Sequence, residues 1–189
     1  MSEPGASDST GIPNQPDNTA VWLAGVLAEA GVRAALIGGQ AVNTWSQPRG
    51  TNDYDFCVDA NREAIERAES RLVDEGFAYL TRLDGDEPSG PDFVRMKNPS
   101  RAIIVDLQTA KTDYQAGVIK RAAVSERGVR IALPEDLIVL KLLAMRSQDQ
   151  RDIAKLMNWN DLDWPYIEHW AGIWQVMDKL AVFRDGRFD

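Results

Sequence analysis

Two aspartates, Asp53 and Asp55, have the spacing that places both side chains on one face of a strand. Side chains alternate along a strand, so residues i and i+2 lie about 6.6 Å apart on one face at roughly 3.3 Å rise per residue. Two carboxylates this close raise each other's pKa unless a cation neutralises them. Mg²⁺ prefers hard oxygen ligands of this kind together with substrate phosphates. The pair therefore predicts a metal-dependent phosphoryl-transfer site, on a strand that Phe56 and Val58 indicate to be partly buried.

Asp-x-Asp is also a common tripeptide, and residues 52–55 on their own are compatible with an exposed strand end or turn. The preceding residues favour a functional site, because an apolar run at 34–37 ends at Gly38 and Gly39 and residues 40–45 then indicate a helix. Glycines let a ligand approach the backbone, and a helix N-terminus offers free N–H groups to nucleotide phosphates. An ordinary tight strand-to-helix turn is the alternative interpretation of the two glycines.

A third carboxylate, Asp106, lies inside the β-branched run at 101–107, which predicts a central strand. A charged side chain is rarely fully buried unless it is paired or binds a metal ion. Asp106 therefore requires a cation. A metal ion shared with the other two aspartates would meet this requirement, and so would an ion pair with Arg49 or Arg95.

The elements that must position these residues alternate between helical and strand patterns. Apolar residues at helical spacing, flanked by capping residues and glycines, predict helices, whereas alternating runs between turn residues predict strands. The expected elements are helices over 17–31 and 61–76 and from Pro134, strands over 77–83, over 93–96 and around Asp106, and hairpins at 98–100 and near Arg127. This order predicts a mixed α and β architecture.

The order and spacing of these motifs resemble the nucleotidyltransferase superfamily related to DNA polymerase β. The segments that carry the resemblance are Gly38-Gly39-Gln40-Ala41, Arg49-x-Thr51-x-Asp53-x-Asp55 and Val105-Asp106. Residues 134–146, followed by residues 149–153, further resemble the AbiEii-like bacterial group of nucleotidyltransferase toxins. The resemblance covers residues 20–158. Many members of the group carry Lys-Asp where this chain has Gln148-Asp149, so any contact from that lysine is absent here.

The resemblance implies an α+β fold, in which helices flank a mixed sheet of the nucleotidyltransferase type and a helical segment follows at the C-terminus. It also implies transfer of a nucleoside monophosphate from a nucleoside triphosphate to an acceptor hydroxyl, with Mg²⁺ or Mn²⁺ as the cofactor. The catalytic and metal-binding residues implied by it are Asp53, Asp55 and Asp106. The nucleotide-binding residues implied by it are Gly38, Gly39, Arg49, Thr51 and Lys141.

Three features of the C-terminal part admit more than one interpretation. Lys141 either extends its ammonium group out of an apolar helix or, as the resemblance implies, reaches the nucleotide phosphates. Asp149 and Asp152 face one side of the next short helix, where Arg146 can pair with either. The aromatic residues of the tail have the spacing of core packing, with a base-stacking or dimer surface as the alternative. They are Trp159, Trp164, Tyr166, Trp170 and Trp174.

Length and composition, 189 residues with 44% hydrophobic content, suffice for one compact domain or for a domain with a small helical appendage. We expect a flexible N-terminal tail over residues 1–18, a catalytic core over 19–133 and a C-terminal helical segment over 134–189. No apolar run reaches the roughly 20 residues of a membrane-spanning helix, and no secretory signal pattern is present, so we expect a cytoplasmic protein without membrane contacts. The single Cys57 excludes an internal disulfide and is expected to be a small buried hydrophobe.

The net charge of −8 gives no global reason to expect nucleic-acid binding, although basic residues between Lys111 and Arg130 could form a local patch. Three functions stay open. The first is an AbiEii-like toxin that modifies tRNA or another macromolecule and has a cognate antitoxin as partner. The second is an aminoglycoside-type small-molecule nucleotidyltransferase, for which we expect a strongly acidic acceptor pocket. The third is a non-catalytic protein that binds nucleotides or a partner.

Overall fold

A seven-stranded mixed sheet forms the centre of the computed structural model, which describes residues 11–85 and 90–185. The strand order is β3-β4-β5-β2-β1-β7-β6. β2 runs parallel to β5 and antiparallel to β1, which confirms the expected mixed sheet. The strands are β1 (Arg33–Ile37), β2 (Asp53–Asp59), β3 (Ala78–Asp84), β4 (Pro91–Asn98), β5 (Ile103–Thr109), β6 (Ala123–Val124) and β7 (Arg130–Ile131).

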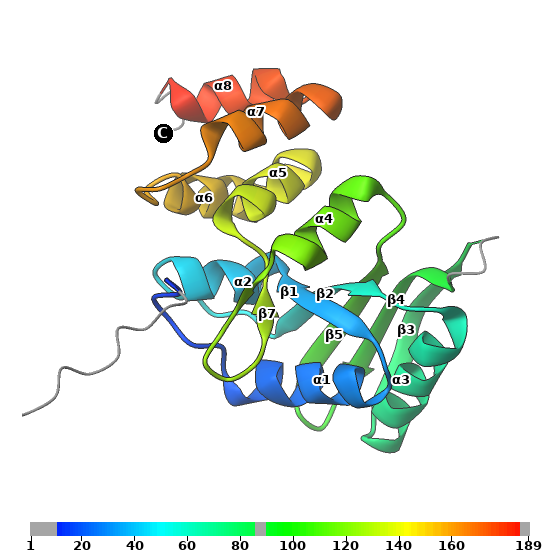
Figure 1. Ribbon diagram of the computed structural model, residues 1–189. Coiled ribbons are helices and arrows are strands. Elements are labelled where there is room, and N and C mark those ends of the chain that lie inside the picture. The colour runs from blue at the N-terminus through cyan, green and yellow to red at the C-terminus, as the bar shows by residue number, and fades with distance from the viewer. Residues whose placement is uncertain (1–10, 86–89, 186–189) are drawn as a thin grey trace, which may run out of the picture.

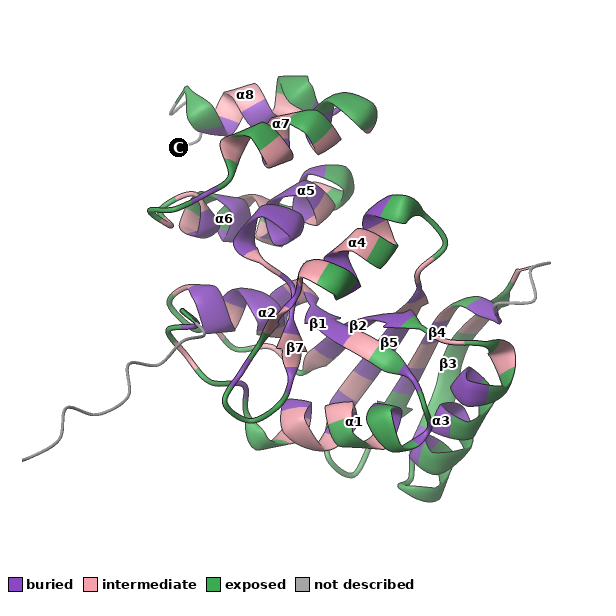
Figure 2. Cartoon of the chain, in the orientation of Figure 1, coloured by how far each residue is buried: buried purple, intermediate pink, exposed green. Residues whose placement is uncertain are grey.

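Helices cover both sides of this sheet. α1 and α3 lie on one side, whereas α4 and the stacked C-terminal helices lie on the other (Figure 1). α7 packs on α5, and most residues of α5 are buried, except in its last turn (Figure 2). The helices are α1 (Asn18–Glu29), α2 (Gly38–Trp45), α3 (Arg62–Asp74), α4 (Asp113–Arg121), α5 (Pro134–Ala144), α6 (Ser147–Leu156), α7 (Trp164–Ile173) and α8 (Met177–Arg184).

The helix boundaries follow the capping residues that the sequence indicates. The Asp17 side chain accepts a hydrogen bond from the backbone N–H of Ala20 at 2.8 Å, and Asn61 caps α3 in the same way at Ala64. Such caps satisfy N–H groups that have no partner inside the helix. α5 begins with Pro134 in its first turn, as predicted.

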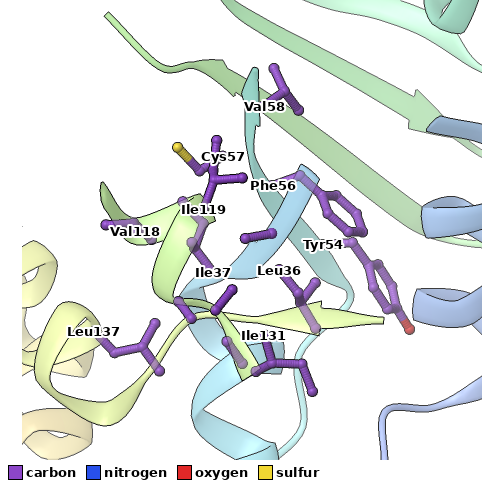
Figure 3. Close-up of a cluster of buried hydrophobic side chains, with 14 of the residues drawn as sticks. Leu36, Ile37, Tyr54, Phe56, Cys57, Val58, Val118, Ile119, Ile131 and Leu137 are labelled. Atoms are coloured by element: carbon purple, nitrogen blue, oxygen red, sulfur yellow. The ribbon is translucent and has the colours of Figure 1, made fainter. Parts of the chain in front are cut away.

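The core that supports the central strands is a cluster of aliphatic and aromatic side chains from several elements (Figure 3). Leu36 of β1, Phe56 of β2 and Leu137 of α5 are each at most 1% exposed. Cys57 is buried in the same region, and burial raises the pKa of its thiol to about 12. The prediction of a buried cysteine is therefore confirmed.

The aromatic residues of the C-terminal part pack inward, as their spacing predicts. Trp170 lies 4.7 Å from Tyr114 of α4, and Trp159 lies 5.3 Å from Trp45 of α2, measured between ring centroids. These contacts join the C-terminal helices to the sheet-bearing part of the chain. The proposed division at residue 133 stays a prediction.

The N-terminal residues that the structure describes differ from a free tail. Ile12 is only 6% exposed, and the Asn14 side chain donates hydrogen bonds to the carbonyls of Asn43 and Ser46, both at 3.0 Å. The expected flexible tail spans residues 1–18, of which residues 1–10 lie outside the described residues. The polar composition of this segment gave no sign of these contacts, because they involve only the side chains of Ile12 and Asn14. In the described part of the chain, no helix is long and apolar enough to cross a membrane.

Candidate active site

A cavity of about 660 Å³ lies between the sheet and helices α5 and α6. It brings together all eight residues that the sequence singled out: Gly38, Gly39, Arg49, Thr51, Asp53, Asp55, Asp106 and Lys141. They come from β1–α2, the segment before β2, β2, β5 and α5, so only the tertiary structure assembles them. Their shared location leaves their individual roles as predictions.

The pairing of β2 with β5 places the aspartates side by side. Asp55 lies directly opposite Asp106 in the parallel register, and Asp53 lies opposite Ile104. Because Asp53 and Asp55 are two residues apart on β2, they point to the same face of the sheet. All three side chains line the cavity.

The electrostatic environment of Asp55 is the most unusual in the cavity. Burial, together with the negative charges of Asp106 and Asp53, raises the pKa of Asp55 to about 7, with Lys141 opposing them. A carboxyl group in this situation is stabilised either by a proton or by a nearby cation. The site therefore has a local need for positive charge at neutral pH.

The two glycines stand where close packing leaves no room for a side chain. Gly38 has φ +65°, and a Cβ atom there would overlap the Asp55 carboxylate. A Cβ at Gly39 would lie 2.9 Å from Nη2 of Arg49. Since α2 begins at Gly38 without a side-chain cap, its first N–H groups remain available to an anion in the cavity.

Asp106 has a cation partner in this structure, and it is Arg95 of β4. Nε of Arg95 donates to Oδ1 at 2.8 Å, and Nη2 donates to Oδ2 at 2.6 Å. Of the two arginines considered as partners from the sequence, the structure thus selects Arg95, while Arg49 pairs elsewhere. Among the described residues, no group of three His, Cys, Asp or Glu side chains is arranged to hold a metal ion.

Lys141 lies at the centre of a buried ionic cluster on the α5–α6 wall. Its ammonium donates to Asp149 at 3.0 Å and to Asp152 at 2.7 Å, and the side chain is 7% exposed. Arg49 reaches the same Asp152 carboxylate through two hydrogen bonds of 2.9 and 2.8 Å. Lys141 therefore does not extend into solvent, which corrects that interpretation, and it faces the cavity from a fixed position.

The carboxylates of this cluster are strongly stabilised in their charged form. Despite burial, hydrogen bonds from Arg49 and Lys141 lower the pKa of Asp152 to about 2. Arg146 donates to Asp149 at 2.7 Å, as one of the two pairings considered from the sequence. The amide of Gln148 donates to Asp152 at 2.9 Å, so the position where the sequence departs from the AbiEii-like pattern belongs to the cluster.

Several cavity residues were not assigned to the site from the sequence. Arg95 was considered only as a partner of Asp106, and Gln108 lies two residues beyond Asp106 on the same face of β5. Leu137, Leu140 and Leu143 of α5 supply an apolar wall. The alternation of β4 and β5 could have revealed the first two, because residues i and i+2 share a face.

The class of this protein follows from comparison with known protein families. A family model described as "Nucleotidyltransferase of unknown function (DUF6036)" matches residues 29–181, so the chain belongs to that family. The superfamily assignment made from the sequence is thereby confirmed, whereas the AbiEii-like branch is not. No curated protein sequence matches the chain.

Solved structures of other nucleotidyltransferases resemble this chain. The solution structure of the antibiotic-resistance factor ANT(2'')-Ia has a TM-score of 0.57 at 15% identity, covering 90% of this chain and 98% of that chain. At this identity the likeness shows the fold alone. The lincosamide antibiotic adenylyltransferase LnuA, with lincomycin bound, has a TM-score of 0.48 at 13% identity, covering 77% of this chain and 99% of that chain.

A putative nucleotidyltransferase from H. pylori has a TM-score of 0.47 at 20% identity, and the match covers 73% of this chain and 68% of that chain. We draw no conclusion from this likeness or from that to LnuA. The mixed sheet with flanking helices is therefore established by the strand order here and by its match to the ANT(2'')-Ia fold.

Proposed function

We propose that this protein transfers a nucleoside monophosphate from a nucleoside triphosphate to an acceptor hydroxyl, with Mg²⁺ or Mn²⁺ as its cofactor. One observation carries the proposal: Asp53, Asp55 and Asp106 line the same cavity as the start of α2. A phosphoryl-transfer site needs positioned negative ligands for a cation and positioned N–H groups for phosphates. This cavity has both.

The chemistry of these donors suits a divalent cation, while the present arrangement of the described residues, with Arg95 bound to Asp106, does not yet form a three-ligand site. Asp53 and Asp55 offer hard carboxylate oxygens, and a cation beside Asp55 would offset the burial and the charge repulsion that raise its pKa. Asp106 completes the set once it releases Arg95. A bound Mg²⁺ or Mn²⁺ would supply positive charge that stabilises the phosphoryl transition state. In this proposal Asp106 also orients or deprotonates the acceptor hydroxyl.

The opposite side of the cavity suits the triphosphate. The free N–H groups at Gly38 and Gly39 and the hydroxyl of Thr51 are candidate donors to phosphate oxygens. Arg49 and Lys141 are held by Asp152, so they act as fixed positive charges. The leucine wall of α5 offers an apolar surface to the nucleobase.

We favour a macromolecular acceptor over a polycationic antibiotic. Among the cavity residues the acidic side chains Asp53, Asp55, Asp106 and Asp149 are matched in number by the basic side chains Arg49, Arg95, Lys141 and Arg146. The strongly acidic pocket expected for an aminoglycoside acceptor is therefore not supported. The AbiEii-like interpretation, in which the protein modifies tRNA or another macromolecule and is neutralised by an antitoxin, remains the proposal.

The basic residues between Lys111 and Arg130 lend this acceptor little support. Lys111 pairs with Asp92, Arg121 lies over the Tyr166 ring, and Arg127 donates to the carbonyl of Pro16 at 2.9 Å. Unlike Arg49 and Lys141, none of these three side chains lines the cavity. An RNA acceptor would have to be recognised mainly at the cavity.

The test is transfer of label from each of four α-³²P nucleoside triphosphates to total tRNA, to lysate protein and to an aminoglycoside, with Mg²⁺ or Mn²⁺. Asp53→Ala serves as the inactive control. Label on tRNA or protein that disappears in this variant supports the macromolecular acceptor, and label on the aminoglycoside alone supports the alternative. Binding of triphosphate with no transfer to any acceptor would instead support a non-catalytic nucleotide-binding protein.

A further inference from the structure

We propose that Arg95 is a positioning residue that occupies Asp106 until nucleotide and divalent cation bind together. On this view the cation must displace the Arg95 guanidinium from Asp106, and the nucleotide triphosphate receives the displaced group. The inference rests on the proposed function and adds to it a coupling between the two ligands. It concerns β4, which the sequence motifs of the site do not include.

The strand pairing of the sheet brings Arg95 and Asp106 into contact. Arg95 lies directly opposite Asp106 in the antiparallel pairing of β4 with β5, and both side chains line the cavity. Cross-strand neighbours on one face lie close enough for their side chains to interact. Two parallel N–H···O bonds, of 2.8 and 2.6 Å, make the pair bidentate.

The pair engages both oxygens of the carboxylate that would complete the metal site. Oδ1 accepts from Nε and Oδ2 accepts from Nη2, so a cation that approaches Asp106 meets a guanidinium of like charge. Repulsion between the two cations makes simultaneous binding unfavourable. Arg95 therefore competes with the cation, whereas Asp53 makes no ion pair among the described residues.

Exposure indicates that Arg95 is the partner able to move. The Arg95 side chain is 38% exposed, while that of Asp106 is 7% exposed and fixed within a central strand. Cζ of Arg95 lies 5.9 Å from the centroid of the Phe93 ring on the same strand. An arginine at the rim of the cavity can rotate toward phosphate oxygens, which accept the same bidentate geometry as a carboxylate.

The consequence is positive coupling between the two ligands. A cation that binds alone must break the Arg95–Asp106 pair and leaves the guanidinium without an anionic partner. The triphosphate, in contrast, offers new acceptors to the released guanidinium. Each ligand therefore raises the affinity for the other by the same factor. Cation binding in the absence of nucleotide is correspondingly weak.

The experiment is a titration of the full-length protein with Mn²⁺ alone, with free Mn²⁺ followed by electron paramagnetic resonance. We expect Arg95→Gln to bind Mn²⁺ about tenfold more tightly than the wild type, because charge-assisted bidentate pairs are among the stronger hydrogen bonds. Arg146→Gln is the matched control. Arg146 lines the same cavity and pairs with Asp149, so its removal changes the cavity charge equally without releasing Asp106.

A double-mutant cycle with Asp106→Asn tests whether the higher Mn²⁺ affinity of Arg95→Gln depends on Asp106. We expect Arg95→Gln to give no tightening beyond that of Arg146→Gln when Asn occupies position 106. Arg95→Lys, which keeps the charge but loses the bidentate fork, should give an affinity between those of the wild type and Arg95→Gln. Circular dichroism of each variant verifies that it is folded.

A third measurement repeats the Mn²⁺ titration with a non-hydrolysable triphosphate analogue. The analogue should raise the Mn²⁺ affinity of the wild type by about tenfold more than that of Arg95→Gln. Equal Mn²⁺ affinities of Arg95→Gln and Arg146→Gln would overturn the inference. If the wild type nevertheless transferred label to an acceptor, the proposed function would stand while the role of Arg95 would fall.

Discussion

The two walls of the cavity treat their charges in opposite ways. On the α5–α6 wall, Lys141 and Arg49 neutralise Asp152, which is fully buried and has a pKa lowered to about 2. On the sheet wall, Asp55 lies beside two other carboxylates, and burial together with their charges raises its pKa to about 7. The comparison indicates that the carboxylates of the first wall are paired with cations, whereas on the second wall Arg95 pairs with Asp106 and Asp53 has no ion-pair partner among the described residues.

The largest expected effect lies on the sheet wall. Asp53→Ala should lower nucleotide transfer by on the order of a thousandfold, because a metal ligand would be lost from the reacting centre. The unfolding free energy should change by less than about 0.5 kcal/mol, since the Asp53 side chain makes no hydrogen bond or ion pair among the described residues. Label transfer and urea unfolding measure the two effects. A variant with full transfer would remove Asp53 from the site.

On the α5–α6 wall the expected loss is one of stability. Asp152→Ala leaves Lys141 buried with one partner fewer and releases Arg49, so the unfolding free energy should fall by about 3–5 kcal/mol. Asp161→Ala, at an exposed position, is the control and should change it by less than about 0.5 kcal/mol. Urea denaturation compares the two. Equal stabilities would show that the cluster contributes nothing to folding.

The glycine turn connects the two walls. Gly38→Ala should lower the unfolding free energy by about 1–3 kcal/mol, because φ is positive and the new Cβ overlaps the Asp55 carboxylate. Transfer activity should fall as well, since Asp55 must shift. Gly50→Ala is the matched control, as a Cβ there meets nothing within 4 Å. Similar losses in both variants would contradict the role of the Asp55 contact.

Folding stability should change with pH in opposite directions for Asp55 on the sheet wall and Asp152 on the α5–α6 wall. The folded-state pKa of Asp55, about 7, lies above its ordinary value of 3.8, so folding stability is lost as pH rises from about 4 to 7. Asp55→Asn removes this loss and should therefore be more stable than the wild type at pH 8, by on the order of 1–2 kcal/mol, with the difference vanishing near pH 4.

Asp152 should show the opposite dependence. Its folded-state pKa of about 2 lies below the ordinary value, so its contribution to folding stability is fully present above pH 4 and is lost as pH falls toward 2.

Thermal unfolding of the wild type and Asp55→Asn from pH 3 to 8 measures the Asp55 effect. An Asp55→Asn variant that is less stable than the wild type at pH 8 would contradict it.

Local patterns predicted most elements of the fold, but they did not predict α4 (Asp113–Arg121) or α8 (Met177–Arg184). Capping residues and glycines marked the helices, alternation marked the strands, and the hairpin at 98–100 joins β4 to β5 as predicted. These signals depend on neighbours in the chain, so a single sequence contains them. The candidate residues for the cavity were also recognisable, because their types and their spacing on strands are local properties.

The pairing of charges was decided by the tertiary structure. Arg49 lies 103 residues from Asp152, and Lys141 turns inward to two carboxylates of the following helix instead of reaching solvent. The register of β4 against β5 determines that Arg95 meets Asp106. Composition and periodicity specify which residues are charged and which face they occupy. Only the packing of elements brings distant side chains within hydrogen-bonding distance, and that packing determines which cavity charges are already neutralised.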